Sequence, residues 1–113
     1  MRLHHENCLV EVSAWGERGD SRCDDAEVWI EGEAILISYL DDEGLVVLEG
    51  RSDGEGGWTL AGRSRPWRAS LEPAPGEARA WVGEIEEQGE RGRWRLRLAE
   101  AEAEAEVDDA STS

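Results

Sequence analysis

Apolar and polar residues change places at almost every step in several short runs of this chain. Eight runs show this alternation or a short apolar stretch, and they cover approximately residues 8–15, 26–31, 34–40, 45–50, 57–62, 66–72, 78–86 and 92–98. A period of two residues is typical of a β-strand with one buried face. Because most links between the runs are short, neighbouring strands are expected to be antiparallel. The sequence therefore predicts an all-β fold, a single small antiparallel meander barrel or sandwich of about eight strands.

Two of these runs, 35–40 and 45–48, are apolar at both odd and even positions. The link between them, from Asp41 to Gly44, is typical of a β-turn, since Asp favours the first position and Gly accepts a left-handed backbone. A strand that is apolar on both faces needs cover on both. We therefore expect a central hairpin whose outer face is covered by a second layer, a partner subunit or a loop.

The last two runs form a hairpin whose register is predicted by its apolar and charged residues. If the turn centres near Gly89, Ile85 faces Trp94 on one side and Glu84 faces Arg95 on the other. A slip by one residue would set arginine against the apolar face, so the pattern selects this pairing.

Six tryptophans supply almost all the aromatic surface, because the chain has one tyrosine and no phenylalanine. Each indole buries ~150–250 Å², so a few of them suffice for a small core. Trp29 shares a strand face with Glu27 and Glu31, which places it outside, and indoles are favoured at the centres of interfaces. The other candidates face inward, where they either fill the core or line a cavity. The candidate binding residues are Trp29, Trp58, Trp67, Trp81 and Trp94.

The charge of the chain narrows the choice of partner. The net charge is −15, and all twelve basic residues are arginine. Residues 1–62 carry −11 and residues 63–98 carry +2, so the domain is electrically polar. Such a charge disfavours nucleic acid and anionic membranes and favours a basic protein partner, with self-association as the other choice. The arginines around Trp67 and along 91–97 suggest an anion patch, but facing glutamates favour ordinary ion pairing.

Residues 1–98 form the predicted domain, and residues 99–113 form an acidic Ala/Glu tail that we expect to be disordered, since it has no apolar face. No apolar segment long enough for a membrane span or a signal peptide is present, so we expect a cytoplasmic protein. Cys8 and Cys23 are then expected to be reduced. Cys8 fits an inward-facing position together with Val10, Val12 and Ala14.

Carboxylates are too abundant for a catalytic pair to be chosen among them, and the chain has only two histidines and two cysteines. The only histidines, His4 and His5, lie at the chain start, so no Ser-His-Asp or Cys-His arrangement is available in the body of the fold. The potential ligands in this region are His4, His5, Glu6, Cys8, Cys23, Asp24 and Asp25. Their spacing matches no standard zinc pattern, and the acids at 41–43 and 53–55 lack a full calcium ladder. We therefore expect no cofactor, no metal site and no enzymatic activity.

The run from Gly92 to Leu98 reads Gly-Arg-Trp-Arg-Leu-Arg-Leu. It resembles the end of small uncharacterised bacterial β-proteins that close on a Gly-x-Trp-Arg-x-x-Leu strand, over approximately residues 35–98. That resemblance implies a β-fold and no particular activity. The meander also resembles avidin and lipocalin barrels in outline, although biotin-binding residues have no counterparts in this chain.

These observations predict a non-catalytic protein-interaction module with an acidic surface. Its contact would be the hairpin over 35–48 or Trp29, and its acidic half would attract a basic partner. The alternative is a small-molecule-binding β-barrel with a tryptophan-lined cavity. The two predictions differ in the interior, which is packed in the first case and hollow in the second.

Overall fold

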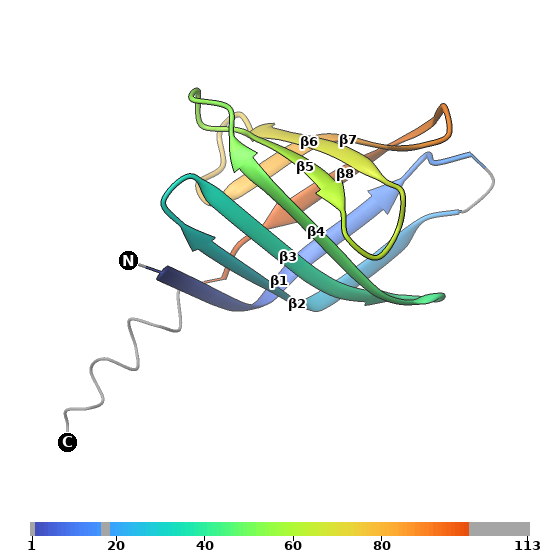
Figure 1. The fold of residues 1–113 in the computed structure, drawn as a ribbon, viewed down its shortest axis with the longest axis horizontal. Coiled ribbons are helices and arrows are strands. Elements are labelled where there is room, and N and C mark those ends of the chain that lie inside the picture. The colour runs from blue at the N-terminus through green and yellow to red at the C-terminus, as the bar shows by residue number, and fades with distance from the viewer. Residues whose placement is uncertain (1, 17–18, 100–113) are drawn as a thin grey trace, which may run out of the picture.

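Eight antiparallel strands close into a barrel (Figure 1). The computed structural model describes residues 2–16 and 19–99. The strands are β1 (Arg2–Ser13), β2 (Ser21–Glu31), β3 (Ala34–Asp41), β4 (Gly44–Ser52), β5 (Trp58–Gly62), β6 (Arg68–Pro73), β7 (Ala80–Glu87) and β8 (Glu90–Arg97). Each strand pairs with the next, and β8 pairs with β1. The predicted all-β meander is confirmed, in its barrel form, and no helix able to span a membrane occurs among the described residues.

The first two strands are longer than predicted. They begin at Arg2 and Ser21, whereas the alternation indicated starts near residues 8 and 26. The β1–β2 ladder shifts register twice, between His5 and Cys8 and between Cys8 and Val10. Asn7, which lies in the first of these shifts, has a φ of 61°. Each bulge adds a residue and breaks the period of two, so the pattern did not reveal the first half of β1.

The barrel interior is filled by side chains, as is usual for eight strands. The most completely buried side chains are Cys8, Val10, Val28, Ile37, Val46, Leu48, Ile85 and Leu96. The inward positions of Cys8, Val10 and Val12 are confirmed, and both cysteines are free. The prediction for Ala14 was wrong: it is exposed, because the chain has left β1 and turns there with a φ of 55°.

The predicted register of the β7–β8 hairpin was wrong by two residues. Trp94 pairs with Gly83 rather than Ile85, and Glu84 pairs with Arg93. Gln88 and Gly89 form the two-residue connection, with φ values of 56° and 89°. Positive φ at both positions suits the tightest hairpin turn, which the sequence pattern did not reveal. A shift of two residues keeps every side chain on its predicted face.

Two indoles lie against glycines of this hairpin. The Trp94 indole N–H donates to the Ser70 carbonyl at 3.0 Å, and a Cβ on its partner Gly83 would lie 1.8 Å from that same oxygen. The Trp15 indole donates to the Glu90 carbonyl at 3.0 Å, and a Cβ on Gly92 would collide with Trp15. The glycines therefore make room for the contacts that tie β8 to β6 and to the loop after β1.

The described chain ends one residue later than the predicted domain. Ala99 packs against the core, and its carbonyl lies 2.7 Å from Nδ1 of the buried His5. The domain therefore extends through Ala99. The remainder of the predicted tail, 100–113, lies outside the described residues.

Candidate interaction surface

Three of the candidate tryptophans, Trp67, Trp81 and Trp94, form hydrogen bonds that connect different strands and loops of the barrel. Trp67 and Trp94 are buried, whereas Trp58 and Trp81 are half-buried at the opposite end from Trp67. The Trp67 indole donates to a Glu87 carboxylate oxygen at 2.8 Å, and the Trp81 indole donates to the Gly56 carbonyl at 2.9 Å. These polar atoms already have partners inside the protein. A role of these residues in binding stays a prediction.

One end of the barrel is closed by Trp15 and Trp67. Their rings meet edge to face with centroids 4.9 Å apart. A hollow of about 90 Å³ remains beside them, next to Tyr39. Ligand sites usually measure ~300–1,000 Å³, so this hollow is too small for one. Trp15, which the sequence pattern did not assign, is thus part of the core.

Trp29 lies on the outside of the wall, as predicted. Its ring stacks on the His4 imidazole, with centroids 4.7 Å apart and planes inclined by 4°. It also lines an outer groove of about 550 Å³ together with Leu36 and Arg51. Covered by His4 on one side, Trp29 is less exposed than an isolated indole would be.

Three arginines of β8, Arg91, Arg93 and Arg95, have carboxylate neighbours, as the facing glutamates suggested. Glu84 lies opposite Arg93 in the ladder, and its carboxylate is 3.9 Å from the Arg91 guanidinium. Arg95 forms an ion pair with Glu77. The positions of these side chains agree with ordinary ion pairing on the outside of a β-sheet.

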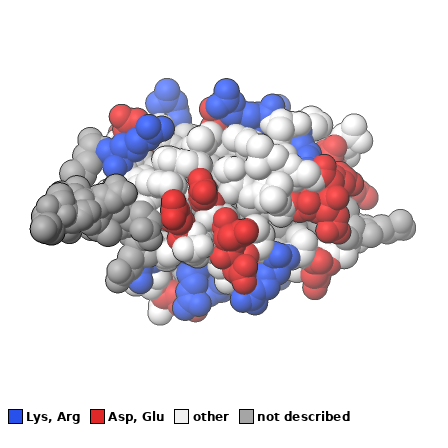
Figure 2. Space-filling model, turned by 90° about the horizontal axis from the view of Figure 1, so that it is seen from below, with Lys and Arg blue, Asp and Glu red and all other residues white. Residues whose placement is uncertain are grey.

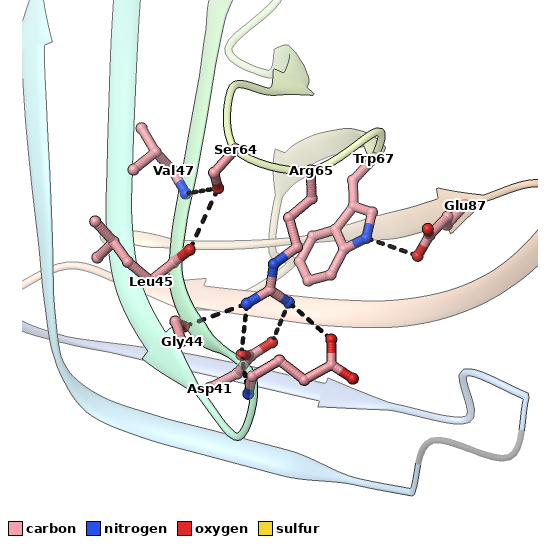
Figure 3. Close-up of polar contacts among 9 residues, drawn as sticks. Asp41, Gly44, Leu45, Val47, Ser64, Arg65, Trp67 and Glu87 are labelled. Atoms are coloured by element: carbon pink, nitrogen blue, oxygen red, sulfur yellow. Dashed lines mark hydrogen bonds and ion pairs between the residues drawn. The ribbon is translucent and has the colours of Figure 1, made fainter.

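The outer face of the β3–β4 hairpin carries the largest exposed apolar side chains among the described residues. Leu40 is 61% exposed and Leu45 is 53% exposed, and the two are direct partners in the ladder. The loop between β5 and β6, residues 63–67, covers only the neighbouring edge of β4. In it, Ser64 Oγ accepts from the Val47 amide at 3.2 Å and donates to the Leu45 carbonyl at 3.3 Å (Figure 3). The predicted cover is therefore partial, and the two leucines stay open to solvent.

Arg65 fixes this hairpin tip from the same loop (Figure 3). Its guanidinium makes two hydrogen bonds of 2.8 Å to the Asp41 carboxylate and a third, of 3.3 Å, to the Gly44 carbonyl. Its other side lies 4.8 Å from the centre of the Trp67 ring. Hydrogen bonding to Arg65 lowers the pKa of Asp41, and Asp41 in turn raises the pKa of Arg65. The tip is thus held in one geometry.

Beside Leu40 the wall of the barrel opens. Ladder pairing between β2 and β3 runs from Glu31 to Glu27, and within the described chain no pairing joins Ser21–Ala26 to Tyr39–Asp41. A hollow of about 280 Å³ lies at this split, lined by Leu40, Cys23 and three aspartates, Asp20, Asp41 and Asp42. Burial and a hydrogen bond to Asp25 raise the pKa of the Cys23 thiol.

Acidic side chains gather at this end of the molecule. Figure 2 shows the side seen from below, with one group of acidic side chains near its middle and another toward the right, where Figure 1 places the β3–β4 turn. We call Leu40, Leu45, Asp20, Asp42 and Glu43 the Leu40–Leu45 surface; all five are exposed. The sequence indicated the hairpin but not this pairing of leucines beside a split between strands.

The acidic turns use their side chains locally. An Asp41 carboxylate oxygen accepts from the Glu43 amide at 2.8 Å, and Asp53 accepts from the Glu55 and Gly57 amides at 2.7 and 3.0 Å. These contacts are turn chemistry of the kind expected from Asp at such positions.

The fold and the surface therefore have to be interpreted from this chain alone: comparison with family models, with curated proteins and with solved structures finds no match.

Proposed function

We propose that this protein is a non-catalytic interaction module that binds a basic protein segment through the Leu40–Leu45 surface. The observation that carries the proposal is a pair of directly opposed, solvent-exposed leucines next to the acidic residues Asp20, Asp41 and Asp42. Burying a leucine side chain contributes ~1.5–3 kcal/mol, so the pair can supply most of the energy of a weak interface. The carboxylates add selectivity for a basic partner.

The rigidity of the hairpin tip supports this role. The Asp41–Arg65 pair already holds the turn, so little conformational freedom is lost when a partner binds. The hollow beside Leu40 is large enough for one side chain. Arg22 also lines it but is paired with Glu11, so Asp20 and Asp42 at its border would attract a Lys or Arg. A segment with alternating basic and apolar residues fits this arrangement.

Self-association through the same surface is a weaker proposal. In a twofold dimer each surface meets its own copy, so Asp42 and Glu43 would lie near identical carboxylates. With a net charge of −15, such a contact adds repulsion that a basic partner does not meet.

Synthetic extended peptides test the proposal: one alternates arginine and leucine, one alternates arginine and serine, and one replaces arginine by glutamate. We expect binding of the first peptide only. The variant L40S/L45S should weaken it at least ~10-fold, the equivalent of ~1.4 kcal/mol. The control E84Q/E86Q removes two carboxylates from β7, outside the Leu40–Leu45 surface, and should leave affinity within ~2-fold.

The salt dependence of the binding rates distinguishes the contribution of the acidic side chains from that of leucine burial. Between ~0.01 and ~0.15 M salt the screening length falls from ~30 to ~8 Å, so the on-rate should fall steeply while the off-rate changes little. Stopped-flow measurements on the wild type and on D20N/D42N/E43Q, which neutralises the three acids of the Leu40–Leu45 surface, give both rates. Equal binding by the wild type and L40S/L45S, or equal loss in E84Q/E86Q, would contradict the proposed surface.

A further inference from the structure

Three potential metal ligands meet on the outside of the barrel, away from the Leu40–Leu45 surface. His4 and Glu6 lie on β1, and Glu27 lies on β2. The His4 Nε2 atom is 3.6 Å from a Glu27 carboxylate oxygen and 4.0 Å from a Glu6 carboxylate oxygen. One ligand atom from each residue lies within 4.8 Å of the other two.

This group differs from the one considered in the sequence. His5 points inward to Ala99, Cys8 is buried, and the Cys23 thiol donates to Asp25. Glu27 comes from the next strand, and the ladder alone brings it to His4. The spacing of the ligands along the chain therefore did not indicate the group.

The His4 imidazole presents a nitrogen that has no hydrogen-bond partner. Its Nε2 atom is closed off from solvent and unpaired. The 3.6 Å separation from Glu27 exceeds the ~3.2 Å limit of a good N–H···O bond. Stacking on Trp29 holds the ring with Nε2 directed toward the two carboxylates. Buried polar atoms without a partner are rare, so this one points to a missing ligand.

The two glutamates face one another without a compensating arginine in the contacts described. His4 pairs with Trp29 and His5 pairs with Val28, and the register shifts before the next pair, Cys8 with Ala26. Glu6 and Glu27 lie within this interval, and a carboxylate oxygen of each lies within 4.8 Å of the other. Like charges this close across neighbouring strands are destabilising. The bulge at Asn7 follows immediately, and bulges often redirect side chains beside binding sites. A bound cation would remove the repulsion and occupy the space between the three groups.

We propose that His4, Glu6 and Glu27 bind one divalent transition-metal ion, with Zn²⁺ as the representative. Around a tetrahedral zinc with bonds of ~2.1 Å, ligand atoms lie about 3.4 Å apart, close to the 3.6 and 4.0 Å separations observed. Both glutamate side chains are partly exposed, so small rotations bring them in and water completes the shell. An imidazole ligand favours zinc and its neighbours over Mg²⁺ and Ca²⁺.

Zinc titration of the intact chain, followed by calorimetry, tests the site. We expect one ion per chain and an increase in melting temperature, since a ligand that binds the folded state stabilises it. The variants H4F, E6Q and E27Q should each weaken zinc binding at least ~10-fold. H4F keeps an aromatic ring on Trp29 and removes only the ligand nitrogen. E49Q, which removes an exposed glutamate from β4, is the matched control and should bind as the wild type does.

Cobalt distinguishes this site from the cysteines. Co²⁺ bound to nitrogen and oxygen should quench Trp29 emission, and W29F should lose that component while keeping its zinc affinity within ~3-fold. C23S should change neither signal. The proposal is overturned if the wild type binds no zinc, if zinc binding survives in both H4F and E27Q, or if it is lost in C23S. Circular dichroism of each variant confirms that loss of binding is not loss of fold.

Discussion

Arg65 connects the β3–β4 turn, through Asp41 and Gly44, with Trp67 in its own loop. Its guanidinium contacts the Asp41 carboxylate, the Gly44 carbonyl and the face of Trp67. The two side chains of the pair are only 14% and 19% exposed, so water screens their attraction weakly. The pair is therefore worth more than an ordinary surface salt bridge and links the β3–β4 turn to the loop after β5.

Replacing Asp41 by Asn should destabilise the protein by about 1–3 kcal/mol, between the values for surface and buried pairs. Asn keeps an oxygen that can accept from the Glu43 amide, so the turn contact is retained, while the charge and one of the two hydrogen bonds from Arg65 are lost. The control E49Q breaks the exposed Arg63–Glu49 pair and should cost under ~0.5 kcal/mol. Urea denaturation at neutral pH measures both; equal losses would show that the Asp41–Arg65 pair is no better than a surface contact.

The same variant should alter the pH dependence of stability. The pKa of Asp41 is lowered in the folded state, so its contribution is present above the ordinary Asp pKa of ~3.9 and is lost as pH falls through the lowered value. The deficit of D41N relative to the wild type should therefore be largest at neutral pH and shrink in acid. Denaturation across a pH series checks this, and a deficit that grows in acid would contradict it.

At the scale of elements, the β7–β8 hairpin depends on the absence of one side chain. Gly83 lets the Trp94 indole cross from β8 to the Ser70 carbonyl on β6. Three strands are thereby joined by one ring, at a place where no β6–β7 ladder pairing is recorded between Ala69 and Glu72. The indole takes over part of the role of the interrupted ladder.

Gly83→Ala should therefore destabilise the protein by about 3 kcal/mol, at the upper end for overpacking, because the new Cβ meets backbone rather than a movable side chain. The control Gly54→Ala lies in open space with a φ of 85° and should cost only the ~1–2 kcal/mol of a left-handed backbone. Thermal denaturation compares the two. A smaller loss in G83A than in G54A would show that β7 can move away from β6.

The alternation of apolar and polar residues was sufficient to predict the strands and their faces, because burial on one side imposes a period of two. It did not predict where strands pair. The β7–β8 register depends on backbone angles at Gln88 and Gly89, and the early part of β1 depends on a bulge at Asn7. Both are local backbone features with little hydrophobic signal. The leucine pair likewise depends on register, so the sequence indicated its strands but not the contact. His4 lies in the part of β1 that the pattern did not reveal, so its proximity to Glu27 could not be predicted.

At the scale of the whole molecule, the Ala99 carbonyl marks the end of the folded domain, because it contacts the buried His5. A chain ending at Leu98 loses the Ala99 carbonyl that lies against the buried His5, and an unpaired buried group costs ~1–3 kcal/mol. A chain ending at Glu100 keeps that carbonyl, and residues 101–113 have no apolar face to bury. We therefore expect the first truncation to lower the melting temperature by several degrees and the second to leave it unchanged. Calorimetry of both truncated chains measures their melting temperatures. Equal values would show that the Ala99 carbonyl does not stabilise the fold.

The pairing of β1 with β8 also affects how fast the chain folds. Leu9 lies beside Arg97, so the last ladder can form only when nearly the whole chain is available. Contacts so distant along the chain make folding slow, in the millisecond-to-second range for β-barrels. Until β8 docks, β1 and β7 each have an unpaired edge, the feature through which nascent chains join one another and aggregate. Residues 1–62 carry a charge of −11, so partly folded chains repel one another. This repulsion opposes aggregation during folding, before the protein meets a partner.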